Sequence, residues 1–148
     1  MTVRETARAF IINEKKQIFL FKHDFNGGNR WFTPGGGIEE GEKVLDALYR
    51  ELEEELGVKK DQVTFLSNDC IEYEYTSPLR KNGKTKDYLY FVRLDKNNFD
   101  FKGFTETEAR YVTGYKWMTL EDIRNEKNCV FVPRNMDEML ESFFQNNA

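Results

Sequence analysis

The chain has 148 residues, a formal net charge of −4, and 39% hydrophobic side chains. This length supports one domain with a sizeable core, which we expect to span residues 1–148. The sequence has no membrane-length apolar run, no signal-peptide pattern and no dominant basic tract. We therefore expect a cytoplasmic protein with no membrane partner and no stable nucleic-acid binding. The two cysteines lack the spacing of metal ligands, which agrees with a reducing cytoplasmic environment.

The N-terminal part of the chain predicts strands separated by turns. Residues 6–13 and 17–22 are apolar at several positions, with a polar turn between them, and predict two strands. Residues 23–30 are polar with a glycine-rich tip, which predicts a loop. Residues 31–33 predict a short strand that leads into a glycine turn.

This glycine turn reads Pro34, Gly35, Gly36, Gly37. Three successive residues without a Cβ allow the backbone to approach a ligand closely or to adopt positive φ. The turn can therefore supply a carbonyl oxygen to a metal ion, or N–H groups to phosphate oxygens.

Residues 43–56 predict an amphipathic helix. At about 100° per residue, four leucines form one stripe that we expect to be the core face: Leu45, Leu48, Leu52 and Leu56. Gly57 and Val58 predict the end of the helix. Glu42 lies near the helix start, where its charge suits the dipole, and Arg50 can hold a carboxylate as a two-pronged donor.

Acidic side chains crowd the last turns of this helix. The helical period brings Glu51, Glu54 and Glu55 onto one arc and turns Glu53 toward solvent. Negative charges are unfavourable at a helix C-terminus, and Glu51 and Glu55 repel each other as an i,i+4 pair. Such a conflict is expected at a functional site. A hard cation with oxygen ligands, Mg²⁺ or Mn²⁺, would resolve it.

The second half of the chain predicts further strands and two helices. Residues 63–75 are strand-rich, and a turn at Asn82 and Gly83 joins them to a strand at residues 87–94. Residues 111–118 predict another strand. Thr119 predicts the N-cap of a helix at residues 120–126, with Asp122 completing a capping box, and residues 134–146 predict a closing amphipathic helix. This element order indicates a mixed α/β domain.

The segment from Gly36 to Val58 resembles the Nudix box, G-x5-E-x7-R-E-U-x-E-E-x-G-U with U aliphatic, at every specified position. The preceding Trp31 to Gly35 is similar to the usual lead-in of that family. The resemblance implies a Nudix-type α/β/α sandwich, in which a mixed β-sheet lies between helices.

The resemblance also implies an enzyme, a Nudix hydrolase that uses Mg²⁺, with Mn²⁺ as a substitute, to cleave a diphosphate bond. Its substrate would be a small molecule, a nucleoside diphosphate linked to another moiety. Glu51 and Glu55 are the first metal-ligand candidates, with Glu54 and a carbonyl of Gly35 or Gly36. Arg50 would orient a glutamate.

The general base is left open. Members of the family often carry it on a later loop, where Glu108 and Glu106 are the candidates here, and we favour Glu108 because it lies nearer the predicted strand. A box carboxylate could do the same work. The predicted catalytic set is therefore Glu51, Glu54, Glu55, Arg50 and Glu108.

Substrate-binding candidates are the three glycines, Arg8 near the first strand, and Phe32 as an aromatic that could stack on a base. Aromatic residues of strands more often belong to the core, so this role of Phe32 competes with packing. No signature separates nucleoside triphosphates from ADP-ribose, dinucleoside polyphosphates or other conjugates. Homodimerisation is left open as well.

Two other functions are compatible with parts of this sequence. One is a catalytically silent sensor module of Nudix fold that binds nucleotides, and the intact carboxylates count against it. The other is an isoprenoid diphosphate isomerase, which relies on a cysteine and metal-binding histidines. His23 is the only histidine, which counts against that chemistry.

Overall fold

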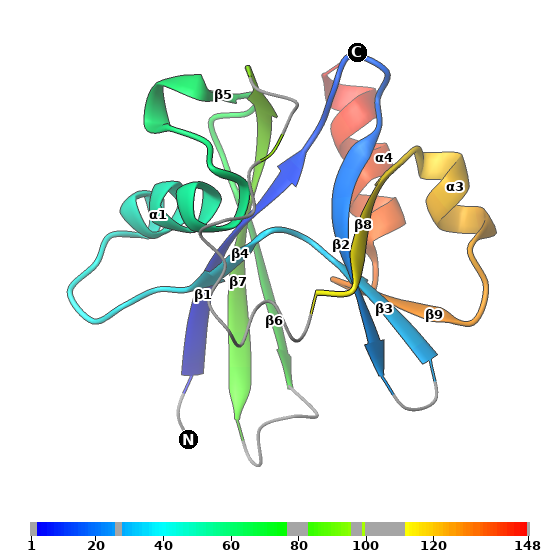
Figure 1. Ribbon diagram of the computed structural model, residues 1–148, viewed down its shortest axis with the longest axis horizontal. Coiled ribbons are helices and arrows are strands. Elements are labelled where there is room, and N and C mark those ends of the chain that lie inside the picture. Colours follow the sequence, from blue (N-terminus) through cyan, green and yellow to red (C-terminus); the bar gives the residue numbers. More distant parts are fainter. Residues whose placement is uncertain (1–2, 26–27, 77–82, 96–98, 100–111, 148) are drawn as a thin grey trace. The chain divides into compact units, whose positions relative to one another are not determined.

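The computed structural model describes residues 3–25, 28–76, 83–95, 99 and 112–147 (Figure 1). The chain divides into two compact units. One comprises Met1–Ile11 and Pro34–Phe104, and the other comprises Ile12–Thr33 and Thr105–Ala148. Each unit is described by itself. Within the described residues, no helix is long and apolar enough to cross a membrane.

The first unit contains a mixed β-sheet. Its strands are β1 (Val3–Ile11), β4 (Gly35–Gly37), β5 (Val63–Phe65), β6 (Ile71–Thr76) and β7 (Lys84–Leu94), with a 3₁₀ turn at Lys60–Gln62. Their order is β4-β1-β7-β5, and β6 also pairs with β7. β1 and β7 run parallel, whereas β4, β5 and β6 each pair antiparallel with their neighbour. The expected hairpin pairing of β6 with β7 is confirmed, although Asn82 of its predicted turn lies outside the described residues.

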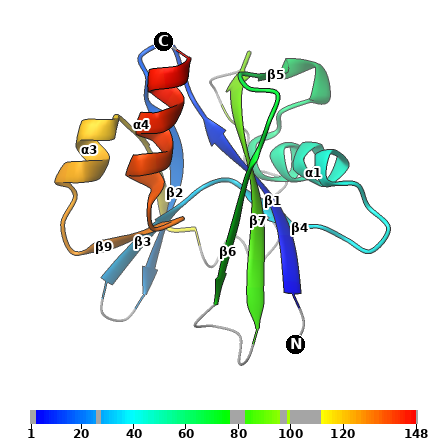
Figure 2. The same ribbon diagram turned by 180° about the vertical axis from the view of Figure 1, so that it is seen from behind.

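Helix α1 (Val44–Leu56) packs on one face of this sheet, against β1 and β4 (Figures 1 and 2). Leu48, Leu52 and Leu56 are fully buried, as the leucine stripe predicts. The prediction is wrong for Leu45, which is 42% exposed. The buried face of α1 begins at Ala47, so the first helical turn precedes the part that packs on the sheet.

The end of α1 follows the sequence prediction. Gly57 adopts φ 67°, a left-handed conformation that costs glycine little. Its N–H donates to the Glu53 carbonyl, and the Val58 N–H donates to the Leu52 carbonyl. Val58 is 1% exposed, which anchors the chain as it leaves the helix.

The predicted glycine turn is instead a short edge strand, β4. Its three glycines pair antiparallel with β1, with Gly37 opposite Thr6 and Gly35 opposite Arg8. Gly35 has φ +142°, a conformation that L side chains rarely adopt. The absence of side chains here permits both the pairing and the close approach of α1.

The second unit contains a second mixed sheet, of order β8-β2-β3-β9. Its elements are β2 (Ile18–Phe25), β3 (Gly28–Phe32), β8 (Gly114–Met118), β9 (Cys129–Val132), α3 (Leu120–Asn125) and α4 (Met136–Asn146). β9 runs parallel to β3, and the other pairs are antiparallel. The α/β class is confirmed, with the strands distributed over two mixed sheets.

Two sequence predictions for this unit need correction, and one of its strands was not predicted. Residues 23–30 are largely strand, because β2 and β3 pair through this stretch, with His23 opposite Arg30. Cross-strand pairing here outweighs polar composition. β9 was not predicted, and α4 begins at Met136, two residues later than expected. The capping box of Thr119 and Asp122 at the start of α3 is confirmed.

Candidate active site

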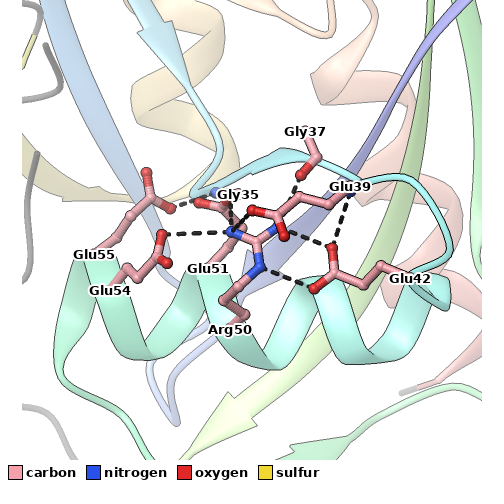
Figure 3. A network of polar contacts seen from close by, with 8 residues as sticks. All are labelled: Gly35, Gly37, Glu39, Glu42, Arg50, Glu51, Glu54 and Glu55. Carbon is pink, nitrogen blue, oxygen red and sulfur yellow. Dashed lines mark hydrogen bonds and ion pairs between the residues drawn. The ribbon is translucent and has the colours of Figure 1, made fainter.

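Three glutamates of α1 project along the side of the helix that lies beside β4 (Figure 3). Glu51 is 8% exposed and Glu55 is 3% exposed, while the Glu54 side chain is 39% exposed. Glu53 differs, because its side chain is 54% exposed and pairs with Lys59. The structure therefore separates the three convergent glutamates from the fourth as the helical period predicts.

Arg50 is the centre of the polar network in Figure 3. Its Nε and Nη2 donate to the two carboxylate oxygens of Glu42, each at 2.9 Å. Nη2 also donates to the Gly37 carbonyl at 2.9 Å, and Nη1 donates to Glu51 Oε1 at 2.9 Å. Glu54 Oε2 lies 3.5 Å from Nη1. One guanidinium thus ties the helix start, the edge strand and two of the convergent carboxylates together.

This network shifts the pKa values of its members. The pKa of Glu42 is lowered to about 2, first because Arg50 donates hydrogen bonds to its carboxylate and then because the Glu39 N–H does. The pKa of Arg50 is raised, chiefly by the hydrogen bonds to Glu42. Both groups therefore stay charged across the physiological range.

Two adjacent glycines of β4 each contact one of the convergent glutamates. A Cβ on Gly36 would lie 2.5 Å from Glu51 Oε1, so the Glu51 carboxylate occupies the space that a side chain would fill. The Gly35 N–H donates to Glu55 Oε1 at 2.6 Å. Gly35 and Gly36 are thus the points at which the edge strand meets the helix carboxylates.

The pairing of β4 with β1 decides which backbone groups face the helix. The Ala9 N–H donates to the Pro34 carbonyl at 3.0 Å, and the Ile38 N–H donates to the Glu5 carbonyl at 2.9 Å. Because hydrogen-bonded pairs alternate along an antiparallel ladder, Gly36 forms the next such pair with Ala7. The N–H and carbonyl groups of Gly35 and Gly37 then point away from β1. The bonds from Gly35 to Glu55 and from Arg50 to Gly37 agree with this alternation.

The donors around β4 are oxygen atoms, which suit a hard divalent cation. As they lie, Arg50 holds Glu51 and Glu54, and Gly35 holds Glu55. Within the described part of the chain, no three acidic, histidine or cysteine side chains are grouped closely enough to hold one ion. A cation would therefore need the carboxylates to turn from these partners.

The other predicted site residues lie in different places. Arg8 lies on β1, and its Nε is 3.7 Å from Asp87 Oδ1. Phe32 belongs to the second unit, where its ring centroid lies 5.8 Å from that of Phe21. Glu106 and Glu108 lie outside the described residues.

Sequence reasoning missed Asp87, which is fully buried on β7 beside Thr6. A signal for it does exist in the sequence. Leu89 and Phe91, spaced two and four residues after Asp87, are buried positions of an alternating strand, so the pattern places a carboxylate at an inward position. A charged residue at such a position calls for a partner.

Comparisons with known proteins agree with the resemblance of the sequence motif. A family model described as NUDIX domain matches residues 2–140. The chain is 32% identical over 123 residues to an RNA pyrophosphohydrolase from Sulfurovum sp., covering 77% of this chain and 78% of that protein. It is 28% identical over 131 residues to an RNA pyrophosphohydrolase from Pelagibacter ubique, covering 83% and 80% respectively. Other relatives of the same name are matched over 56% and 58% of their own length.

The fold is also found among solved structures. A NUDIX-family hydrolase from Clostridium perfringens superposes with a TM-score of 0.68 at 20% identity, covering 99% of each chain. At this identity the likeness concerns the fold.

Proposed function

The chain belongs to the NUDIX domain family and is a Nudix pyrophosphohydrolase, and on that premise we propose that it cleaves the diphosphate bond of a nucleoside diphosphate linked to another moiety, with Mg²⁺. The observation that carries this proposal is the row of Glu51, Glu54 and Glu55 beside the glycine strand β4. A diphosphate bears adjacent anionic phosphates, so its hydrolysis requires local positive charge, which acidic residues supply by binding cations.

Glu51 and Glu55 are the proposed first ligands of the metal, with Glu54 beside them. The backbone ligand is the Gly35 carbonyl, because the alternation along β4 commits the Gly36 carbonyl to the ladder with β1. The oxygen donors fit such an ion, and the missing side chain at Gly36 gives the Glu51 carboxylate room beside the strand. When bound, Mg²⁺ or Mn²⁺ neutralises phosphate charge and acidifies a water molecule.

Arg50 is proposed to act through the glutamates. It holds Glu51 at 2.9 Å and is itself fixed by the bidentate pair with Glu42. A guanidinium that makes several hydrogen bonds restricts the rotamers of the carboxylates it contacts. It would therefore fix the positions from which these carboxylates can bind a metal ion. Glu42 supports this arrangement from the start of α1.

The reaction requires a base that takes a proton from the attacking water while the bridging P–O bond breaks. We propose Glu108 for this role on the sequence resemblance, with Glu106 and the box carboxylates as the other candidates. Substrate contacts are proposed for Gly35, Gly36, Gly37 and Arg8 of the first unit and, from the sequence alone, for Phe32. Whether the protein forms a homodimer is tested by measuring its molecular mass in solution.

A second substrate has one specific observation in its favour. The relatives that match at 28% and 32% identity are named RNA pyrophosphohydrolases, so the 5′-polyphosphate end of an RNA is a candidate. The net charge of −4 argues against a broad electrostatic grip on an RNA chain. Recognition of an RNA would then concentrate on its end.

The test is a substrate panel with Mg²⁺ and with Mn²⁺ in water enriched in ¹⁸O. The panel contains nucleoside triphosphates, ADP-ribose, sugar nucleotides, dinucleoside polyphosphates and 5′-triphosphorylated oligoribonucleotides, and mass spectrometry identifies the products. We expect metal-dependent cleavage of at least one diphosphate bond, and the labelled product identifies the phosphorus that water attacks.

The outcomes separate the candidate functions. Cleavage of nucleotide conjugates with oligoribonucleotides untouched supports the first substrate, and the reverse result supports the second. A protein that binds members of the panel without cleaving any of them would be the silent sensor module, and the proposal would be abandoned.

A further inference from the structure

Arg4 is an exposed arginine of β1 whose guanidinium lies beside the glycine strand β4. A Cβ on Gly37 would lie 3.6 Å from Arg4 Nη2 and 3.7 Å from Arg4 Nε, both ordinary van der Waals distances. The Arg4 side chain therefore extends from β1 onto the edge strand. No hydrogen bond or ion pair joins this side chain to another residue that the structure describes.

Strand alternation places Arg4 on the sheet face opposite α1. Gly36 lies opposite Ala7, and a Cβ on Gly36 would point to Glu51 of the helix. A Cβ on the next residue, Gly37, would point to the other face, where it would meet Arg4. Arg4 thus reaches the edge of the sheet from the face that does not pack on α1.

Gly37 is flanked by two arginines, one on each face of the sheet. From the helix side, Arg50 donates to the Gly37 carbonyl at 2.9 Å. The same guanidinium also donates to Glu42 and Glu51. From the other side, Arg4 lies beside the same glycine. A guanidinium carries five N–H donors. Those of Arg50 are committed to carboxylates and a carbonyl, whereas those of Arg4 remain for an anion.

The carboxylate next to Arg4 in sequence is engaged elsewhere. Glu5 points to the opposite face, where its Oε2 accepts a hydrogen bond from the Tyr88 hydroxyl at 2.6 Å. On the face of Arg4, Thr85 is its partner on β7, and Tyr75 lies beside Thr85 on β6. Burial raises the pKa of Tyr75, and the positive charge of Arg4 opposes that rise, so its field reaches this row. The paired neighbours of Arg4 on this face are therefore neutral.

We propose that Arg4 binds a phosphate beyond the scissile diphosphate bond, so that the protein prefers substrates with three phosphates in a row to those with two. The inference rests on the proposed function. Gly35, whose carbonyl is the proposed backbone ligand of the metal, is two residues from Gly37, which corresponds to roughly 7 Å along β4. A phosphate chain that follows the strand from the metal would bring its next phosphate to Arg4. A guanidinium can bind two oxygens of one phosphate at once.

This role narrows the substrate class of the proposed reaction. Nucleoside triphosphates, dinucleoside polyphosphates with three or more phosphates and 5′-triphosphorylated RNA ends carry a third phosphate in the chain. ADP-ribose and sugar nucleotides have two phosphates and would leave Arg4 without a partner. The first group is therefore favoured over the second.

The test compares two analogues that differ by one phosphate, α,β-methylene-ADP and α,β:β,γ-bismethylene-ATP, whose bridging carbons resist hydrolysis. Calorimetry with Mg²⁺ measures their affinities for the wild type and for Arg4→Ala. We expect the wild type to bind the triphosphate analogue more tightly. In Arg4→Ala, binding of this analogue should weaken about tenfold, roughly the effect of losing one hydrogen bond to a charged group. Binding of the diphosphate analogue should change by less than about twofold.

The matched control is Arg93→Ala, which removes the same charge from an exposed position on β7 of the same unit. It should bind both analogues as the wild type does. Arg4→Ala should keep the wild-type thermal unfolding temperature, because the side chain is exposed and makes no bond within the described chain. A wild type without preference for the triphosphate analogue, or an Arg4→Ala variant that retains the wild-type preference, would overturn the inference. Equal weakening in Arg4→Ala and Arg93→Ala would also overturn it, because net charge alone would then explain the effect.

Failure of the proposed function would look different. In that case the wild-type protein would cleave no member of the substrate panel. The affinities for the two analogues do not depend on turnover, so they would still decide whether Arg4 binds a third phosphate.

Discussion

The carboxylate of Glu51 occupies the space beside Gly36 that a side chain would fill. A Cβ on Gly36 would meet Glu51 Oε1 at 2.5 Å and the other carboxylate atoms at 2.6 and 2.7 Å. Real Cβ atoms do not approach other atoms so closely, so one of the two residues would have to move. The glycine is therefore required by the position of the glutamate.

Gly36→Ala should displace the Glu51 carboxylate and disrupt its bond to Arg50. We expect kcat to fall about 100-fold, because misplacement of a catalytic group by an ångström has an effect of that order. The measurement is steady-state kinetics on purified protein, with circular dichroism to establish folding.

Gly37→Ala is the matched control for that substitution. A Cβ there would lie 3.6 Å from Arg4 Nη2, an ordinary van der Waals contact, and the Gly37 carbonyl would remain available to Arg50. Because Gly37 is proposed to contact the substrate, any loss in this variant should appear in KM, while kcat stays within about twofold of the wild type. Equal losses in the two alanine variants would mean that flexibility of β4, and not the space at Gly36, is what matters.

Arg50→Lys should lower both stability and activity. A lysine ammonium cannot reproduce the planar guanidinium that donates to Glu42, Gly37 and Glu51 at once. We expect a loss of about 1.5–3 kcal/mol in the free energy of unfolding, the range for hydrogen bonds to charged groups. Urea titration measures it. Arg124→Lys is the control, since Arg124 makes exposed ion pairs on α3 and should change stability little. Unchanged stability in Arg50→Lys would show that a single charge suffices at this position.

The sequence predicts those parts of the molecule that local spacing determines. The helical period and the helix-ending Gly57 define α1 and its three convergent glutamates, and Thr119 defines the start of α3. β9 was not predicted because it is stabilised by pairing with β3, through contacts a hundred residues apart in sequence such as Asn29 with Cys129. Leu45 has the right period for the core, but it lies in the first turn of α1, before the buried face begins at Ala47.

The site shows the same division. Spacing brings Glu51, Glu54 and Glu55 together and assigns Arg50 a carboxylate partner. It does not reveal that Arg50 has four hydrogen-bond partners, because Gly37 and Glu42 reach it only through the path of β4 and the following loop. Asp87 was missed because its partners Thr6 and Arg8 lie on a strand about 80 residues away.

The folded protein should lose stability in acid through Glu42. The pKa of this group is lowered from 4.5 to about 2 in the folded state. A carboxyl with a depressed folded pKa stabilises the fold fully above its unfolded value, and this contribution is lost as the pH falls from about 4.5 toward 2. Thermal unfolding of the wild type and of Glu42→Gln across this window should show a shallower pH dependence in the variant. Glu40→Gln, at an exposed neighbouring position, should retain the wild-type slope; parallel curves for all three proteins would contradict the assignment.

Glu55→Gln should abolish metal-dependent turnover with little change in fold. Glutamine retains an oxygen that can accept the Gly35 N–H bond of 2.6 Å, but it removes the negative charge proposed to bind Mg²⁺. We expect Mg²⁺ affinity to fall by at least about tenfold, as the loss of groups around a metal generally causes. Calorimetry with Mg²⁺, and turnover at saturating substrate, measure the two effects. Glu53→Gln on the same helix is the control, because Glu53 is exposed and pairs with Lys59; equal loss in both variants would indicate a general effect of helix charge.

The identity of the general base can be decided by a pair of isosteric variants, Glu108→Gln and Glu106→Gln. A general base must be deprotonated to act, so kcat falls on the acidic side of its pKa, and removal of the base removes this limb of the profile. If Glu108 is the base, Glu108→Gln should lower kcat by roughly 100-fold and flatten the acidic limb, while Glu106→Gln leaves both nearly unchanged. The reverse pattern would assign the role to Glu106. An unaltered acidic limb in both variants would transfer the role to a carboxylate of α1, where Glu54, the most exposed of the three convergent glutamates, is then the residue to substitute.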